Sequence, residues 1–109
     1  MAYDTAVADH IRGRIGNHPR FSAREMFGGI GFMIGGHMAV GVSGDEIMVR
    51  VDKDAHDEFA AMPGARTFDW SARPMRGWIS VAPEGFATDH DLDAWIDRGV
   101  RYAKSLPPK

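Results

Sequence analysis

Three arginines, Arg66, Arg73 and Arg76, lie close together in the sequence and could hold a carboxylate or a phosphate. A guanidinium offers several N–H donors in a planar fork, so arginines are common bidentate partners of such anions. Arg73 and Arg76 flank a Pro-Met pair on a predicted loop, and Arg66 lies on the strand before it. The alternative is that Arg73 pairs with Asp69 or Glu84 and only fixes the loop, which is the usual role of isolated arginines. We favour this structural role over an anion site.

The other reactive side chains do not fall into a catalytic or metal-binding pattern. The sequence contains no cysteine, and none of its five histidines has a metal-binding spacing such as His-x-x-x-His. Asp89, Asp91 and Asp93 could hold a divalent ion, but they open a predicted helix, where acidic residues usually interact with the helix dipole. No serine lies in a nucleophile-elbow motif. We therefore predict no catalytic residue, no cofactor and no bound metal.

The glycine-rich segment MFGGIGFMIGGHMAV raises the possibility of a phosphate-binding loop. A dinucleotide-binding loop has the pattern G-x-G-x-x-G between a strand and a helix. Here Gly29 and Gly31 are followed by Gly35, which comes one residue too late, and then by another strand-like run. The glycines instead favour two-residue hairpin turns at residues 35–36 and 44–45, where positive φ angles are needed. The segment therefore predicts part of an antiparallel sheet.

A small set of helices and strands must position these side chains. The expected order is a helix over residues 3–16, three strands joined by the two glycine turns, a short helix capped by Asp52, strands over residues 65–70 and 77–82, and a helix that begins at Thr88. About five antiparallel strands, interrupted and closed by helices, make an α+β fold. The whole chain, residues 1–109, is expected to form one domain.

The register of the three strands decides which side chains share a face. If both turns are two residues long, Val40 lies opposite Gly31 and Val49. The predicted core face then holds Gly29, Gly31, Met33, Met38, Val40, Val42, Ile47, Val49 and Val51. The opposite face carries a patch of large apolar side chains, Ile30, Phe32, Ile34 and Met48. Such patches seldom face water in a monomer, so we predict a protein interface and a homodimer, with a covering helix as the alternative.

The overall composition indicates a soluble globular class. The chain has 109 residues, of which 44% are hydrophobic and 26% charged. Its net charge of -2 argues against duplex DNA as a ligand, because DNA binding by bulk charge needs a basic surface. We expect no signal peptide, because the N-terminal segment carries acids and lacks a continuous apolar run, and the sequence contains no run of about 18 apolar residues such as a membrane helix needs. We expect a cytoplasmic protein that binds neither DNA nor membranes.

Several short segments together resemble one protein family. They are MFGG at residues 26–29, RVD at residues 50–52 and RPM at residues 73–75, followed by a closing helix with a tryptophan. In this combination the chain resembles the N-terminal domain of TfoX/Sxy proteins, which are bacterial regulators of natural competence. The resemblance implies an α+β domain like that of secretion chaperones, with a helix followed by a curved antiparallel sheet. Full-length regulators carry a second, nucleic-acid-directed domain, which we expect this chain to lack.

Together these observations predict a non-enzymatic regulatory domain that binds other proteins. Its expected partners are a second copy of itself and an unidentified regulatory protein. The alternative is a small-anion or nucleotide-binding module, or a minor enzyme, centred on Arg66, Arg73 and Arg76.

Overall fold

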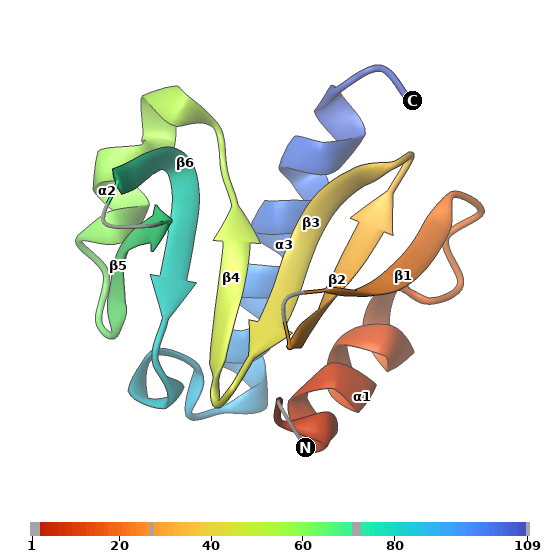
Figure 1. The fold of residues 1–109 in the computed structure, drawn as a ribbon, viewed down its shortest axis with the longest axis horizontal. Helices are drawn as coiled ribbons and strands as arrows, with labels where there is room; N and C mark the ends of the chain where they lie inside the picture. The colour runs from red at the N-terminus through yellow and green to blue at the C-terminus, as the bar shows by residue number, and fades with distance from the viewer. Residues whose placement is uncertain (1–2, 27, 71–72, 109) are drawn as a thin grey trace.

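The computed structural model describes residues 3–26, 28–70 and 73–108, and its centre is an antiparallel sheet with the strand order β1-β2-β3-β4-β6-β5 (Figure 1). The strands are β1 (Phe21–Met26), β2 (Gly29–Ile34), β3 (His37–Ser43), β4 (Glu46–Arg50), β5 (Ala65–Trp70) and β6 (Arg73–Val81). The helices are α1 (Thr5–Ile15), α2 (His56–Ala60) and α3 (Asp89–Ser105), with short 3-10 helices at Lys53–Ala55 and Pro83–Phe86. The predicted α+β class is confirmed. The sheet has six strands instead of about five, and β1 is the additional one.

Three helical segments begin at a side-chain cap, and two of these caps, Asp52 and Thr88, are those predicted from the sequence. The Asp4 carboxylate accepts a hydrogen bond from the backbone N–H of Ala6 at 2.9 Å, at the start of α1. The Thr88 hydroxyl accepts one from the backbone N–H of Asp91 at 3.1 Å, at the start of α3. Asp52 caps the 3-10 helix that leads into α2. Each cap satisfies an N–H group that the helix itself leaves unpaired. None of the described helices is both long and apolar enough to cross a membrane.

Both predicted glycine turns are confirmed. Gly35 and Gly36 join β2 to β3 with φ angles of 63° and 84°, a region that favours glycine. Gly44, with a φ of 59°, begins the turn between β3 and β4. Beyond this second turn, β3 and β4 pair in the predicted register, with Val42 opposite Ile47.

A β-bulge in β3 changes the register between β2 and β3. Met33 pairs with Met38 as expected, but the next pair is Phe32 with Val40, so that Ala39 is an extra residue in β3. Beyond a one-residue bulge, each residue of β2 shares a face with residues of β3 that a regular register would place on the other face. Phe32 therefore lies on the same face as Val40, instead of the opposite one.

The expectation of an exposed patch on β2 is therefore wrong. Ile30, Phe32 and Ile34 are 5%, 0% and 2% exposed and belong to the hydrophobic core. Phe32 stacks on Phe21 with 6.0 Å between ring centroids, and the guanidinium of Arg12 lies 5.4 Å from the centroid of the Phe32 ring. The alternative that we considered, a face covered by helices, is the one that the structure has.

α3 covers the core on the helix side of the sheet, behind β3 and β4 in Figure 1. Trp95 and Ile96 are 1% and 0% exposed, and the indole N–H of Trp95 donates to the carbonyl of Gly85 at 3.2 Å. A Cβ atom on Gly99 would collide with the carbonyl oxygen of Ala39. The extra residue of the bulge is thus a point of very close contact between α3 and the sheet.

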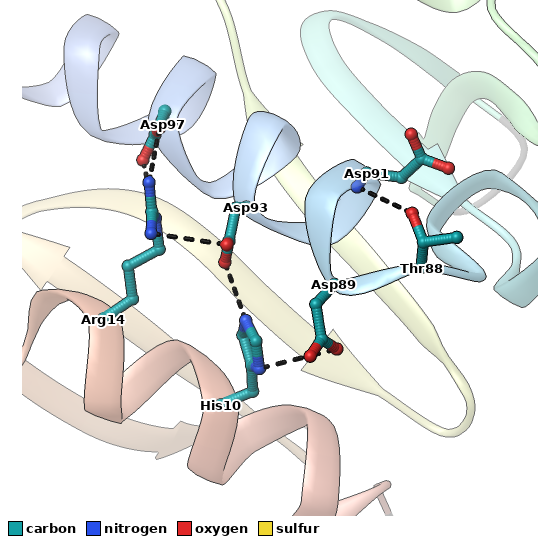
Figure 2. A network of polar contacts seen from close by, with 7 residues as sticks. All are labelled: His10, Arg14, Thr88, Asp89, Asp91, Asp93 and Asp97. Carbon is teal, nitrogen blue, oxygen red and sulfur yellow. Dashed lines mark hydrogen bonds and ion pairs between the residues drawn. The ribbon is translucent and has the colours of Figure 1, made fainter.

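A network of charged side chains holds α1 against α3 (Figure 2). The His10 Nε2 atom lies 2.7 Å from an Asp93 carboxylate oxygen, and His10 Nδ1 lies 4.0 Å from Asp89. Arg14 donates from Nε and Nη2 to the two Asp97 oxygens at 3.0 and 2.9 Å. The three acids are four residues apart, so they lie on one side of α3. Asp89 and Asp93, considered above as ion ligands, here face His10.

We expect Phe32→Ala to lower the free energy of unfolding by about 3–5 kcal/mol, because it removes a fully buried ring from the core. Urea unfolding followed by circular dichroism measures this loss. The matched control is Met33→Ala on the next residue, which is only half-buried and should cost about 1 kcal/mol or less. Equal effects of the two variants would contradict the observed register.

The contact between Arg14 and Asp97 should make a small part of the stability depend on pH. The hydrogen bond from Arg14 holds the pKa of Asp97 below its ordinary value. A lowered pKa in the folded state stabilises the protein above the unfolded pKa of about 3.9, and this contribution disappears as the pH falls through the folded pKa. Because both side chains are partly exposed, we expect about 0.5 kcal/mol at neutral pH. Urea unfolding should show that Arg14→Ala has a lower free energy of unfolding than the wild type at pH 7, and that this difference disappears in acid. A difference that stays constant with pH would argue against the contact.

Candidate functional site

The face of the sheet opposite the helices, here called the open face, has no described helix packed on it (Figure 1). It is hollowed by a cavity of about 550 Å³. Residues from all six strands line this cavity, which therefore extends across the sheet from β1 to β5. The lining residues are Met26, Gly29, Ile30, Met38, Ser43, Met48, Phe68, Asp69, Met75 and Trp78. The volume lies within the range of about 300–1,000 Å³ that is typical of ligand sites.

The middle of the open face is a row of paired residues that crosses the whole sheet. From β1 to β5 this cross-strand row consists of Arg24, Gly31, Gly41, Met48, Ser80 and Arg66. Residues paired directly across antiparallel strands point to the same face. The two adjacent glycines leave the backbone of β2 and β3 uncovered by side chains of their own. Both glycines are nevertheless buried, because neighbouring side chains cover them.

Methionine side chains occupy the space above these two glycines. A Cβ atom on Gly41 would lie 2.5 Å from the Met38 Cε atom. A Cβ atom on Gly31 would lie 3.0 Å from the same methyl group and 3.2 Å from the Cε atom of Met26. Methionine is unbranched and polarizable, so these methyl groups can move and repack around an apolar ligand. The open face thus presents an adaptable apolar surface.

A buried histidine helps to set the direction of the side chains on β6. His56 is 3% exposed, and its Nδ1 atom accepts the backbone N–H of Gly77 at 2.8 Å. Its Nε2 atom therefore carries the proton and donates it to the Thr67 hydroxyl at 2.8 Å. Gly77 has a φ of 93°, which interrupts the regular alternation of the strand. As a result, Met75 and Trp78 both line the cavity although they are three positions apart.

The part of the open face near the start of β4 and β5 is polar. Arg66 donates from Nη1 and Nη2 to the two Glu46 carboxylate oxygens at 3.2 and 2.7 Å. These hydrogen bonds raise the pKa of Arg66 above its ordinary value. A smaller cavity of about 180 Å³ lies here, with Ser43 and Ser80 in its wall. Because Arg66 is already bound to a carboxylate in bidentate fashion, it offers little to a free anion.

The three arginines predicted as an anion site do not converge. Arg76 pairs with Asp57 of α2 at 3.0 Å, whereas Arg66 pairs across the open face with Glu46. Arg73 begins β6, although the sequence predicts a loop there. Within the described ranges, no ion pair joins Arg73 to either of its predicted partners. The guanidiniums therefore face different carboxylates.

Of the four residues predicted for a protein interface, only Met48 has its side chain on the open face. The prediction missed the other large apolar residues of the cavity, which are Met26, Met38, Phe68, Met75 and Trp78. Met38 was assigned to the core because the expected register lacked the bulge. Met26 and Met75 lay outside the expected strands. The sequence feature that could have indicated this cavity is the concentration of methionines beside glycines.

Two comparisons with known proteins bear on this chain. The family model described as the TfoX N-terminal domain matches residues 14–103. No curated protein matches the chain. The matched segment contains all six strands and most of α3.

Two neighbouring residues of β4 test the assignment of the two faces. We expect Met48→Glu to stay folded with a loss of about 1 kcal/mol or less, because its side chain lies on the open face. We expect Val49→Glu to unfold the domain, because it places an unpaired charge at a position that is 0% exposed. Circular dichroism and thermal unfolding distinguish the two results. A folded Val49→Glu or an unfolded Met48→Glu would contradict the assignment.

Proposed function

The chain belongs to the TfoX N-terminal domain family, and on that premise we propose that it is a regulatory domain that binds a protein partner through its open face. The observation that carries this proposal is the cavity of about 550 Å³, lined mainly by methionine and aromatic side chains. Contiguous apolar surfaces of this kind usually mark interaction sites in globular proteins. The resemblance to competence regulators supports a regulatory setting.

Binding without catalysis is the second part of the proposal. Asp69 is the charged residue in the wall of this cavity, and beside it Arg66 and Glu46 neutralise one another. His56, the buried histidine, uses both of its ring nitrogens in hydrogen bonds that hold α2, β5 and β6 together. These side chains are therefore engaged in maintaining the fold. Their arrangement supports a surface that recognises a partner by shape and apolar contact.

The alternative function, a small-anion or nucleotide-binding module, has less support. It requires Arg66, Arg73 and Arg76 to act together, and two of them already bind different carboxylates. The open face, by contrast, is mostly apolar where it lines the larger cavity. A phosphate would lose more hydration there than these arginines could replace.

The other expectations from the sequence remain predictions. Ile30, Phe32 and Ile34, the β2 residues on which the homodimer was based, are buried within the protomer, so a symmetric dimer would have to use another surface. Weak affinity for duplex DNA still follows from the net charge of -2. A cytoplasmic location also stays a prediction.

Affinity capture with the purified chain tests the proposed function. We expect the wild type to recover a protein partner, and we expect the amount recovered to fall about tenfold or more with Met48→Glu, which puts a charge into the wall of the cavity. Arg101→Glu, on the exposed side of α3, is the matched control and should recover the partner normally. Sedimentation velocity on the same variants shows whether the partner is a second copy. Equal recovery with Met48→Glu would refute the proposal.

A further inference from the structure

The dimensions of the open face fit a helix that lies across the strands. The cross-strand row from Arg24 to Arg66 spans five interstrand spacings of about 4.8 Å, or roughly 24 Å in all. An α-helix of about 16 residues has this length. The cavity runs in the same direction, since its walls extend from Met26 on β1 to Phe68 on β5. A cylinder lying along the row would therefore run parallel to the cavity and meet it at Met48, the residue of the row that lines it.

The hydrogen-bonding capacity of the open face also favours a helix over an extended segment. Strands β2, β3, β4 and β6 each have neighbours on both sides, so their backbone groups are largely used within the sheet. The cavity wall consists mainly of methionine, aromatic and glycine residues. An extended peptide would bury its own N–H and C=O groups there without partners, which is costly. A helix satisfies these groups internally and presents only side chains.

A second copy of this chain fits the cavity poorly if the two open faces meet. Two hollows of about 550 Å³ facing each other would enclose a large empty space. Stable interfaces are packed about as densely as protein interiors, without such voids. A convex element from another protein fills the hollow instead.

At its β1 end, the open face offers a positive charge to an acidic group of a partner. Two arginines, Arg24 and Arg66, lie on this face with two acids, Glu46 and Asp69. The positive and negative charges on this face are therefore equal in number, and Asp69 is the charged residue in the wall of the larger cavity. Arg66 is bound to Glu46. Arg24, at the β1 end of the row, is exposed and forms no ion pair with the residues that the structure describes.

We infer that the occupant of the open face is an amphipathic α-helix of a partner protein, lying along the cross-strand row. Its large apolar side chains enter the cavity among the methionines, and its acidic residues lie over Arg24. This inference rests on the proposed function, because it specifies the kind of protein segment that the open face recognises. Methionine-lined surfaces suit this mode, since they repack around different apolar helix faces.

Synthetic peptides test this inference directly. The probe is a peptide of about 16 residues, with leucines three and four positions apart on one face and glutamates in its first turn, where they also stabilise the helix. One control peptide has lysines in place of the glutamates. A second has a central proline, which interrupts the helix but leaves the apolar composition nearly unchanged. Fluorescence anisotropy measures affinity, and methyl NMR of the methionines locates the bound peptide.

We expect saturable binding of the glutamate peptide, with shifts of the Met26, Met38 and Met48 methyl signals. Met62, which packs against the core on the helix side, is the internal control and should not shift. Met48→Glu should weaken binding about tenfold or more. Arg24→Glu should weaken it about three- to tenfold and reverse the preference between the glutamate and lysine peptides.

Three results would overturn the inference. They are equal affinity for the proline peptide, a shift of Met62 in place of the open-face methionines, and an unchanged preference in Arg24→Glu. If no helical peptide binds while capture of the protein partner still depends on Met48, the helix is wrong and the proposed function stands. If capture does not depend on Met48 either, the proposed function fails as well.

Discussion

The extra residue Ala39 in β3 is the constraint on which the rest of the structure depends. Because side chains alternate along a strand, one inserted residue decides which face of β2 is buried. With the bulge, Phe32 enters the core beside Val40, and Gly31 pairs with Gly41 on the opposite side. Without it, the glycines would lie beneath the helices and the aromatic ring would face water. The core and the open face are therefore two consequences of the same local irregularity.

The bulge also connects the packing of α3 to the shape of the open face. Ala39 is the residue whose carbonyl lies against Gly99, where a side chain on α3 would not fit. The residue before it, Met38, is directed to the other side and places its methyl group above Gly31 and Gly41. The close approach of α3 and the methionine at the centre of the cavity thus occur at adjacent residues. This explains how a helix on one face of the sheet constrains the surface on the other.

Much of the fold could be predicted from local signals, while the site depended on a non-local one. The caps at Asp4 and Thr88 and the glycine turns follow from the chemistry of single residues and their neighbours. β1 was missed because FSAREM is largely exposed and contains good helix formers, so no alternation of apolar residues marks it as a strand. The bulge could not be predicted because nothing in the sequence around Ala39 differs from a regular strand. The extra residue Ala39 packs against Gly99 of α3, which comes from the far end of the chain, so this contact leaves no local signal.

The glycines on the open face are better explained by the shape of this surface than by the stability of the sheet. Glycine within a strand costs conformational entropy and contributes no side chain to packing. The core is formed on the other side, by residues such as Val40, Val49 and Trp95, and does not need Gly31 or Gly41 to be small. Neither glycine has the positive φ angle that would require it for backbone reasons. What their absent side chains provide is room for the methionine methyl groups. The feature that first suggested a phosphate loop is therefore accounted for by an apolar binding surface.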